Sequence, residues 1–249
     1  RYLPGSITVV DTMGADCEDT GLVWEDGDAD RLAKPASNTL VRAPWLGNDV
    51  AQCILSLYEL DGQQNDLDPR MILQKVLDKF TEIGLTPDVA CELEFYLCGP
   101  RKFGERPHLP ASPTSNHTPI GNEVYGLREL DDHMDFLRDL YNCAQLQGLP
   151  IEAAISEFAP GQLEIGLDHR ADALRVADEA MMYKRLVKGV AVKHGLEACF
   201  MAKPFQGLAG NGQHLHVSVL DKDGNNIFAQ GSENGDKIDR KSTRLNSSH

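Results

Sequence analysis

Apolar residues repeat with a helical period in three segments of the chain from residue 68 onward. Asp68 suits the N-cap of a helix and Pro69 its first position, and apolar residues then recur at helical spacing until Gly84. The same spacing recurs over residues 130–147 and 171–194. The pattern predicts three amphipathic helices that each bury one face against a sheet.

Shorter apolar runs between and after these helices are typical of β-strands. The predicted strands are residues 88–97, 151–158, 162–167, 197–203 and 213–220. The pair Asp223-Gly224 predicts a hairpin turn into residues 226–229. The proline-rich segment 100–122 is predicted to be a long loop.

The first part of the chain has a different pattern, without helical periodicity. Short β-like runs separated by turns rich in Gly, Asp and Asn are predicted as strands at residues 7–11, 39–41 and 51–60. We therefore expect an α+β chain with a small β-rich domain at residues 1–65 and a larger domain at residues 66–239.

Composition excludes some classes of partner. The 249 residues carry 24 Lys and Arg against 38 Asp and Glu, a formal net charge of −14. Such a charge disfavours binding to nucleic acid or to an anionic membrane. No apolar run reaches the ~20 residues that cross a bilayer, and no signal peptide is recognisable. We expect a cytoplasmic protein.

The two ends of the chain have unusual features. Residues 240–249 contain three basic residues and no acidic one, unlike the acidic chain before them. We interpret this segment as a non-native tail, while a disordered native tail is the alternative. The chain also begins at Arg1, just before an expected strand. We therefore expect a fragment truncated at both ends.

Strand alternation gives the first indication of chemistry. Over residues 89–95 the apolar side chains share one face, so Glu92 and Glu94 project from the other. A solvated strand face is the ordinary interpretation of such a pair. Two carboxylates ~7 Å apart nevertheless repel each other unless a cation lies between them.

Two further segments show the same division into an apolar and a polar face. A Pro-Gly turn separates Glu157 from Glu164, which brings both toward one end of a hairpin. A glycine-rich turn then leads into a strand with His214, His216 and Ser218 on one face. Imidazole binds divalent cations and hydroxyls bind phosphate oxygens, although surface histidines beside a turn are equally common.

Taken together, the three polar faces indicate a single site. If they line one cavity, four carboxylates and a histidine form an oxygen-rich site that suits Mg²⁺ or Mn²⁺. A structural zinc site would usually recruit thiolates instead. Each strand is unremarkable alone, but the joint pattern is hard to obtain by chance.

The motifs that carry these residues resemble those of a known family. The strings CELEFYL, SEFAPGQLEIGL and FMAKPFQGLAGNGQHLHVSV resemble, in order, three motifs of the glutamine synthetase family. The resemblance extends from about Val10 to about Phe228. Within the family, the chain is most similar to the bacterial γ-glutamylpolyamine synthetase branch.

This resemblance implies a set of ligands for two metal ions, Mg²⁺ or Mn²⁺. Glu94, Glu157 and Glu164 match ligands of the metal on the glutamate side. Glu92 and His214 match ligands of a second metal beside the nucleotide phosphates.

The resemblance also implies substrate contacts. Gly210 matches a glycine whose backbone meets the substrate glutamate, and Ala209 stands where members that use ammonia usually have asparagine. The nucleotide side is matched by Glu152, His216 and Ser218. Asp11 resembles a catalytic aspartate that a neighbouring subunit contributes to the ammonium or amine pocket.

The implied parent enzyme is an ATP-dependent ligase that joins glutamate to ammonia or an amine through γ-glutamyl phosphate. Its fold would be a β-grasp-like domain, incomplete here, followed by the first half of a catalytic domain with a curved antiparallel sheet and flanking helices. The family's later ligands and arginines lie beyond this chain, so we expect the fragment to be inactive and the full-length parent to form a homo-oligomeric ring.

Two other interpretations remain at this point. A non-catalytic relative could keep the fold as a structural or binding protein, but it would have no reason to keep all five ligands. In a generic metal-binding domain, the presence of His216, Ser218 and the glycine-rich turn would be coincidental.

Overall fold

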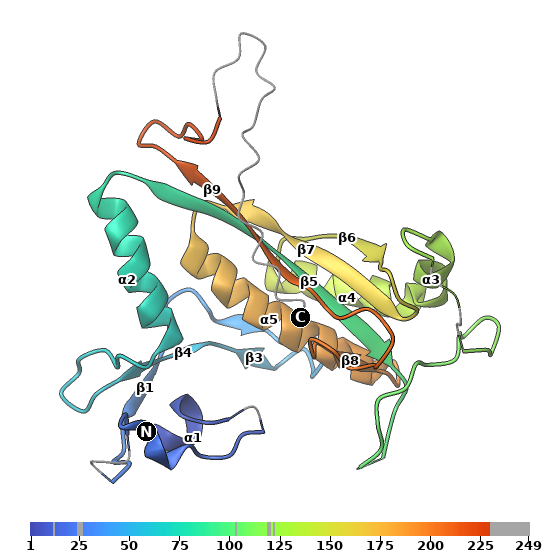
Figure 1. The fold of residues 1–249 in the computed structure, drawn as a ribbon, viewed down its shortest axis with the longest axis horizontal. Coiled ribbons are helices and arrows are strands. Elements are labelled where there is room, and N and C mark those ends of the chain that lie inside the picture. Colours follow the sequence, from blue (N-terminus) through green and yellow to red (C-terminus); the bar gives the residue numbers. More distant parts are fainter. Residues whose placement is uncertain (12, 24–26, 103, 119–120, 122, 230–249) are drawn as a thin grey trace. The chain divides into compact units, whose positions relative to one another are not determined.

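The computed structural model describes residues 1–11, 13–23, 27–102, 104–118, 121 and 123–229. Its contacts divide the chain into two units, one of residues 1–40 and 52–83 and one of residues 41–51 and 84 onward. Helices and an antiparallel sheet both occur, as expected for an α+β chain (Figure 1). The predicted tail at 240–249 lies outside the described residues.

The described residues of the first unit form one short antiparallel sheet and three helical segments. Strand β1 (Leu32–Pro35) pairs with β4 (Leu55–Tyr58). The helical segments are α1 (Gly5–Thr8), the 3₁₀ turn η1 (Glu18–Thr20) and α2 (Pro69–Glu82). The β-grasp-like domain stays a prediction, because the described part of this unit shows this two-stranded sheet alone.

The strand expected at residues 7–11 is wrong. The backbone N–H and the hydroxyl of Thr8 both donate to the carbonyl of Pro4, at 2.8 and 2.7 Å. The N–H of Gly5 donates to Asp28 Oδ1 at 2.7 Å. These bonds close one helical turn, which apolar alternation alone does not reveal.

The strand expected at residues 51–60 is divided in two, β3 (Ala51–Gln52) and β4. Thr39 causes the interruption, because its hydroxyl accepts a hydrogen bond from the N–H of Ile54 at 3.1 Å. The carbonyl of Ile54 accepts from Ala36. The expected strand at 39–41 is displaced to β2 (Val41–Arg42), which pairs with β3, and β1 was not predicted.

The second unit is built on a five-stranded antiparallel sheet. Its strands are β5 (Thr86–Cys98), β6 (Ile151–Ser156), β7 (Gln162–Arg170), β8 (Glu197–Cys199) and β9 (Gln213–Leu220). The order is β6-β7-β5-β8, and β9 pairs with β5 on the same edge as β8. All five predicted strands are present, although β8 is shorter than expected.

The helices in the described part of this unit are α3 (Leu127–Asp132), α4 (Met134–Gln147) and α5 (Ala173–Lys193). The helix expected at residues 130–147 is present but divided in two, because His133 leaves helical geometry with φ −109° and ψ 19°. Apolar spacing continues across this residue, so periodicity does not reveal the break. None of the described helices is long and apolar enough to cross a membrane.

One face of the sheet is the core of the unit. Helix α5 packs against β5, β7 and β8, and α4 lies beside α5 (Figure 1). Tyr183 on α5 and Phe95 on β5 are fully buried and both contact the ring of Phe200. On β9, however, Leu215 and Val217 are 40% and 42% exposed, because this strand lies at the edge of the sheet.

We predict that Asp68→Ala destabilises the first unit by about 1–3 kcal/mol. Its Oδ1 caps α2 through the N–H of Arg70, and its Oδ2 accepts from the buried N–H of Leu57, both at 2.9 Å. Urea unfolding followed by circular dichroism should show a lower midpoint. Asp78→Ala on the exposed side of the same helix should leave the midpoint nearly unchanged.

Candidate metal centre

Three predicted ligands come together on the face of the sheet opposite the core. Glu92, Glu164 and His214 each offer a ligand atom, and these atoms lie within 4.8 Å of one another. His214 Nδ1 lies 3.0 Å from Glu92 Oε2. The residues come from three different strands, β5, β7 and β9, and are half-buried.

The strand register explains this meeting. Glu92 on β5 stands opposite His214 of β9 on one side and Gly166 of β7 on the other. Glu94, two residues further along β5, stands directly opposite Glu164. Cross-strand neighbours of this kind have Cβ atoms ~5 Å apart, so their side chains share one patch.

Glu94 and Glu157 complete the acidic patch. Glu94 Oε2 accepts a hydrogen bond from Gln162 Nε2 at 2.8 Å. Glu157 follows β6, and its N–H donates to the carbonyl of Gln162 at 2.8 Å. Burial raises the pKa of Glu157, and the charge of Glu94 raises it further. All five predicted metal ligands therefore belong to one electrostatic group.

The patch favours a cation. Burial raises the pKa of Glu164 to about 7, and the charges of Glu92, Glu157 and Glu94 add to the effect. Burial also disfavours ionised Glu92, but His216 and His214 outweigh it and lower the pKa of this carboxyl. Crowded carboxylates with an imidazole form a donor set that Mg²⁺ or Mn²⁺ fits.

The glycine-rich segment 207–212 passes close to the patch. A Cβ on Gly212 would lie 2.6 Å from Glu94 Oε1 and 2.7 Å from His214 Nε2, so a side chain would fill the space between these groups. A Cβ on Gly210 would lie 2.6 Å from the carbonyl oxygen of Ala202. Gly210 requires glycine because its close neighbour is backbone, whereas the close neighbours of Gly212 are the ends of two side chains.

The residues predicted for the nucleotide side extend the patch along the same face. His216 Nε2 lies 2.7 Å from Glu92 Oε1. The carboxylate of Glu152 lies over Gly166, within 2.4 Å of the position a Cβ would take there. Ser218, further along β9, accepts from Asn226 Nδ2 at 3.3 Å and pairs with Asp88 of β5.

The remaining two predicted site residues have different surroundings. Ala209 packs against a cluster with Tyr96 and Ala159, and its carbonyl accepts from the Tyr96 hydroxyl at 2.7 Å. Asp11 is exposed in the first unit. Its Oδ1 accepts from the N–H groups of Ala15 and Met13, which lower its pKa.

Sequence reasoning missed Gln162 and Glu129. Strand alternation puts Gln162 on the same face as Glu164, but it does not indicate the bond to Glu94. Glu129 is buried on the short helix α3, where Oε1 accepts from the N–H of Gly161 and Oε2 from the hydroxyl of Ser156. Nothing in the local pattern indicates this contact.

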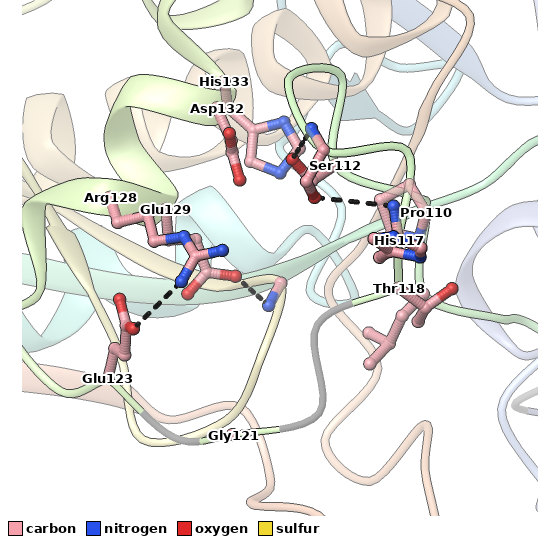
Figure 2. Close-up of a pocket in the computed structure, with 13 residues that line it drawn as sticks. Pro110, Ser112, His117, Thr118, Gly121, Glu123, Arg128, Glu129, Asp132 and His133 are labelled. Carbon is pink, nitrogen blue, oxygen red and sulfur yellow. Dashed lines mark hydrogen bonds and ion pairs between the residues drawn. The ribbon is translucent and has the colours of Figure 1, made fainter.

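Glu129 also lines a cavity of about 350 Å³ (Figure 2). Ser112, Asp132, His133 and Gly161 contribute to its wall. No predicted metal ligand is among the described residues that line it, so the cavity is separate from the acidic patch. The cavity and the acidic patch both adjoin the turn between β6 and β7, because Gly161 in this turn lines the cavity and Glu157 of the patch precedes it.

Comparison with known proteins shows the family to which the chain belongs. Residues 66–241 match the family described as "Glutamine synthetase, catalytic domain". The chain belongs to the glutamine synthetase family.

Among curated proteins, the chain is 35% identical over 231 residues to "Gamma-glutamylputrescine synthetase PuuA" of Escherichia coli K12, covering 92% of this chain and 48% of that protein. It is 37% identical over 208 residues to a glutamine synthetase of Thermus thermophilus, with 81% and 44% covered. It is 31% identical over 223 residues to "Glutamate--isopropylamine ligase" of a Pseudomonas species, with 89% and 47% covered.

A solved structure titled "GmaS/ADP complex-Conformation 1" is similar to this chain, with a TM-score of 0.72 and 31% identity. The match covers 83% of this chain and 46% of that one. The chain thus spans about half the length of the relatives it matches.

We predict that the chain without metal loses stability between about pH 4.5 and about pH 7 through Glu164. Its raised pKa means that the unfolded state ionises first, so the stability present at low pH is lost as the pH rises through this window. Glu164→Gln should therefore melt higher than the parent chain near neutral pH, and the two should converge in acid.

Thermal unfolding across this pH range, in the presence of a chelator, measures the difference. Glu82→Gln, at the exposed end of α2, is the control and should follow the parent chain. Adding Mn²⁺ should stabilise the parent more than Glu164→Gln. Parallel curves for the parent and the Glu164 variant would contradict the electrostatic account.

Proposed function

We propose that this chain is part of an ATP-dependent ligase that joins the γ-carboxyl group of glutamate to an amine. One observation carries the proposal: Glu92, Glu164 and His214 offer ligand atoms within 4.8 Å of one another, and Glu94 and Glu157 belong to the same acidic patch. Membership of the glutamine synthetase family supports the reaction class.

The proposed ligand sets follow the two ends of the patch. Glu94, Glu157 and Glu164 hold the metal on the glutamate side. Glu92 and His214 hold the second metal on the nucleotide side. Bound Mg²⁺ or Mn²⁺ supplies positive charge for oxygens that carry charge during phosphoryl transfer.

The chain's own groups place the reactants. The backbone at Gly210 approaches the substrate glutamate, with no side chain between them. Glu152, His216 and Ser218 line the nucleotide end of the same face. A carboxylate resists attack by a neutral amine, so the γ-phosphate of ATP is first transferred to it, giving γ-glutamyl phosphate and ADP. The amine then attacks the carbonyl carbon of γ-glutamyl phosphate, loses a proton, and displaces phosphate.

A non-catalytic relative with the same fold is less well supported. Crowded carboxylates raise one another's pKa and destabilise the metal-free fold. A purely structural protein would have no reason to maintain such a patch together with its imidazole. The presence of the whole set favours an enzyme.

The complete active site extends beyond this chain in our proposal. The chain spans about half the length of these relatives. We propose a homo-oligomeric ring in which Asp11 of one subunit serves the amine pocket of a neighbour. The 249 residues alone should then lack ligase activity.

We predict that Glu94→Ala abolishes γ-glutamyl amide formation, because a ligand on the glutamate-side metal is lost. The assay follows ATP-dependent product formation with Mg²⁺ or Mn²⁺. It uses the protein encoded by the longest reading frame of the source DNA that contains these residues. Glu82→Ala, outside the patch, should retain activity. Activity in Glu94→Ala equal to the parent's would exclude Glu94 as a ligand.

For the amine, we propose an alkylamine or polyamine in preference to ammonia. Two relatives are named as ligases for putrescine and isopropylamine, while others are glutamine synthetases. Ala209 replaces the asparagine usual in members that use ammonia, and its side chain packs against the cluster containing Tyr96. The net charge of −14 also attracts a cationic amine.

Competition between ammonium and putrescine in the same assay tests this choice. We expect putrescine to be the preferred acceptor, with its product dominating at equal concentrations. A clear preference for ammonium would contradict the amine assignment and leave the ligase reaction itself intact.

A further inference from the structure

Gln162 is a fully buried polar side chain at the meeting point of three elements. It begins β7 directly after the turn at Gly161, and 0% of it is exposed. In the register it stands opposite Tyr96 of β5. The glycine-rich segment 207–212 lies against its amide. Burying such a group is costly unless its hydrogen bonds are made.

Its amide group is oriented by hydrogen bonds on both sides. Gln162 Oε1 accepts from the N–H of Ala159 at 3.3 Å. Its Nε2 lies 2.8 Å from Glu94 Oε2, 2.9 Å from the carbonyl of Gly210 and 3.3 Å from Asn211 Oδ1. The amide has two hydrogens, and the two shortest contacts use both.

These two bonds have different consequences. The first holds Oε2 of Glu94, and the other oxygen, Oε1, then lies beside Gly212 on the side of His214. The second holds the backbone of the glycine-rich segment at Gly210. One side chain thus orients a carboxylate of the patch and anchors the loop next to it.

We infer that Gln162 is a positioning residue that orients the Glu94 carboxylate for a cation and ties the glycine-rich segment to the same carboxylate. This inference rests on the proposed function, in which Glu94 is a metal ligand. Groups that orient a ligand typically contribute about 10- to 100-fold to metal affinity. A packing role alone would leave metal affinity unchanged in a folded variant.

The variant Gln162→Met distinguishes the orienting role of Gln162 from a packing role. Methionine has a similar length and volume, so the site stays filled while both donors are removed. The matched control is Gln147→Met on α4. Gln147 is also buried, and its Nε2 donates to the carbonyl of Arg42 at 2.6 Å. Both variants lose a buried amide, but only Gln162 touches the patch.

The first measurement is Mn²⁺ binding by the 249-residue chain, with free Mn²⁺ followed by electron paramagnetic resonance. Gln162→Met should raise the Kd by about tenfold or more. Gln147→Met should keep the Kd within about twofold of the parent value, although both variants melt lower. Equal Kd values for the parent and Gln162→Met would overturn the orienting role.

Two further measurements exclude a merely structural effect. In the Glu94→Ala background, adding Gln162→Met should change the Kd by no more than about twofold, because the group it orients is gone. Hydrogen exchange in segment 207–212 should be faster in Gln162→Met than in Gln147→Met. If the Kd changes of Glu94→Ala and Gln162→Met were fully additive, Gln162 would not act through Glu94. Unchanged hydrogen exchange in segment 207–212 would contradict its role in holding this segment.

Failure of the proposed function gives a different result. If the parent chain binds no Mn²⁺, the metal site itself is wrong, and the orienting role fails with it. If the parent binds Mn²⁺ but Gln162→Met binds it equally well, the metal site stands and only the role of Gln162 is rejected.

Discussion

Strand β5 pairs along both of its edges, and this double pairing is the constraint on which the site depends. With β7 on one side and with β8 and β9 on the other, the side chains of β5 have only the two faces of the sheet to occupy. Helix α5 fills one face, where Leu93 and Phe95 are buried. Glu92 and Glu94 must therefore share the other face with the carboxylate of Glu164 and the imidazole of His214.

The fold tolerates this crowding through a few specific contacts. His214 and His216 lie against Glu92, and Gln162 donates to Glu94, so two of the carboxylates have partners. Burial raises the pKa of Glu164 to about 7, and the like charges around it add to the effect. Such crowding of carboxylates is costly, and a bound cation would offset the cost. Stability and the proposed function thus make opposite demands on the same side chains.

Local sequence patterns determined many of the helices and strands and the faces on which their side chains lie. The alternation in residues 89–95 correctly separated the buried face from the carboxylate face. Asp68 and Pro69 marked the start of α2 correctly, because a cap is a contact between residues close in the chain. Periodicity failed at His133, where the backbone leaves helical geometry, and at residues 7–11, where Thr8 closes a helical turn on the carbonyl of Pro4.

Only the tertiary structure decided which residues meet. Nothing near Gln162 in sequence indicates that its amide bonds to Glu94 and to Gly210, 68 and 48 residues away. The same holds for Glu129, whose carboxylate caps a turn 32 residues away at Gly161. Alternation determines the face on which a side chain lies, because successive residues of a strand point to opposite sides. Which strands become neighbours, and in what register, depends on pairing between distant segments, and local patterns do not encode it.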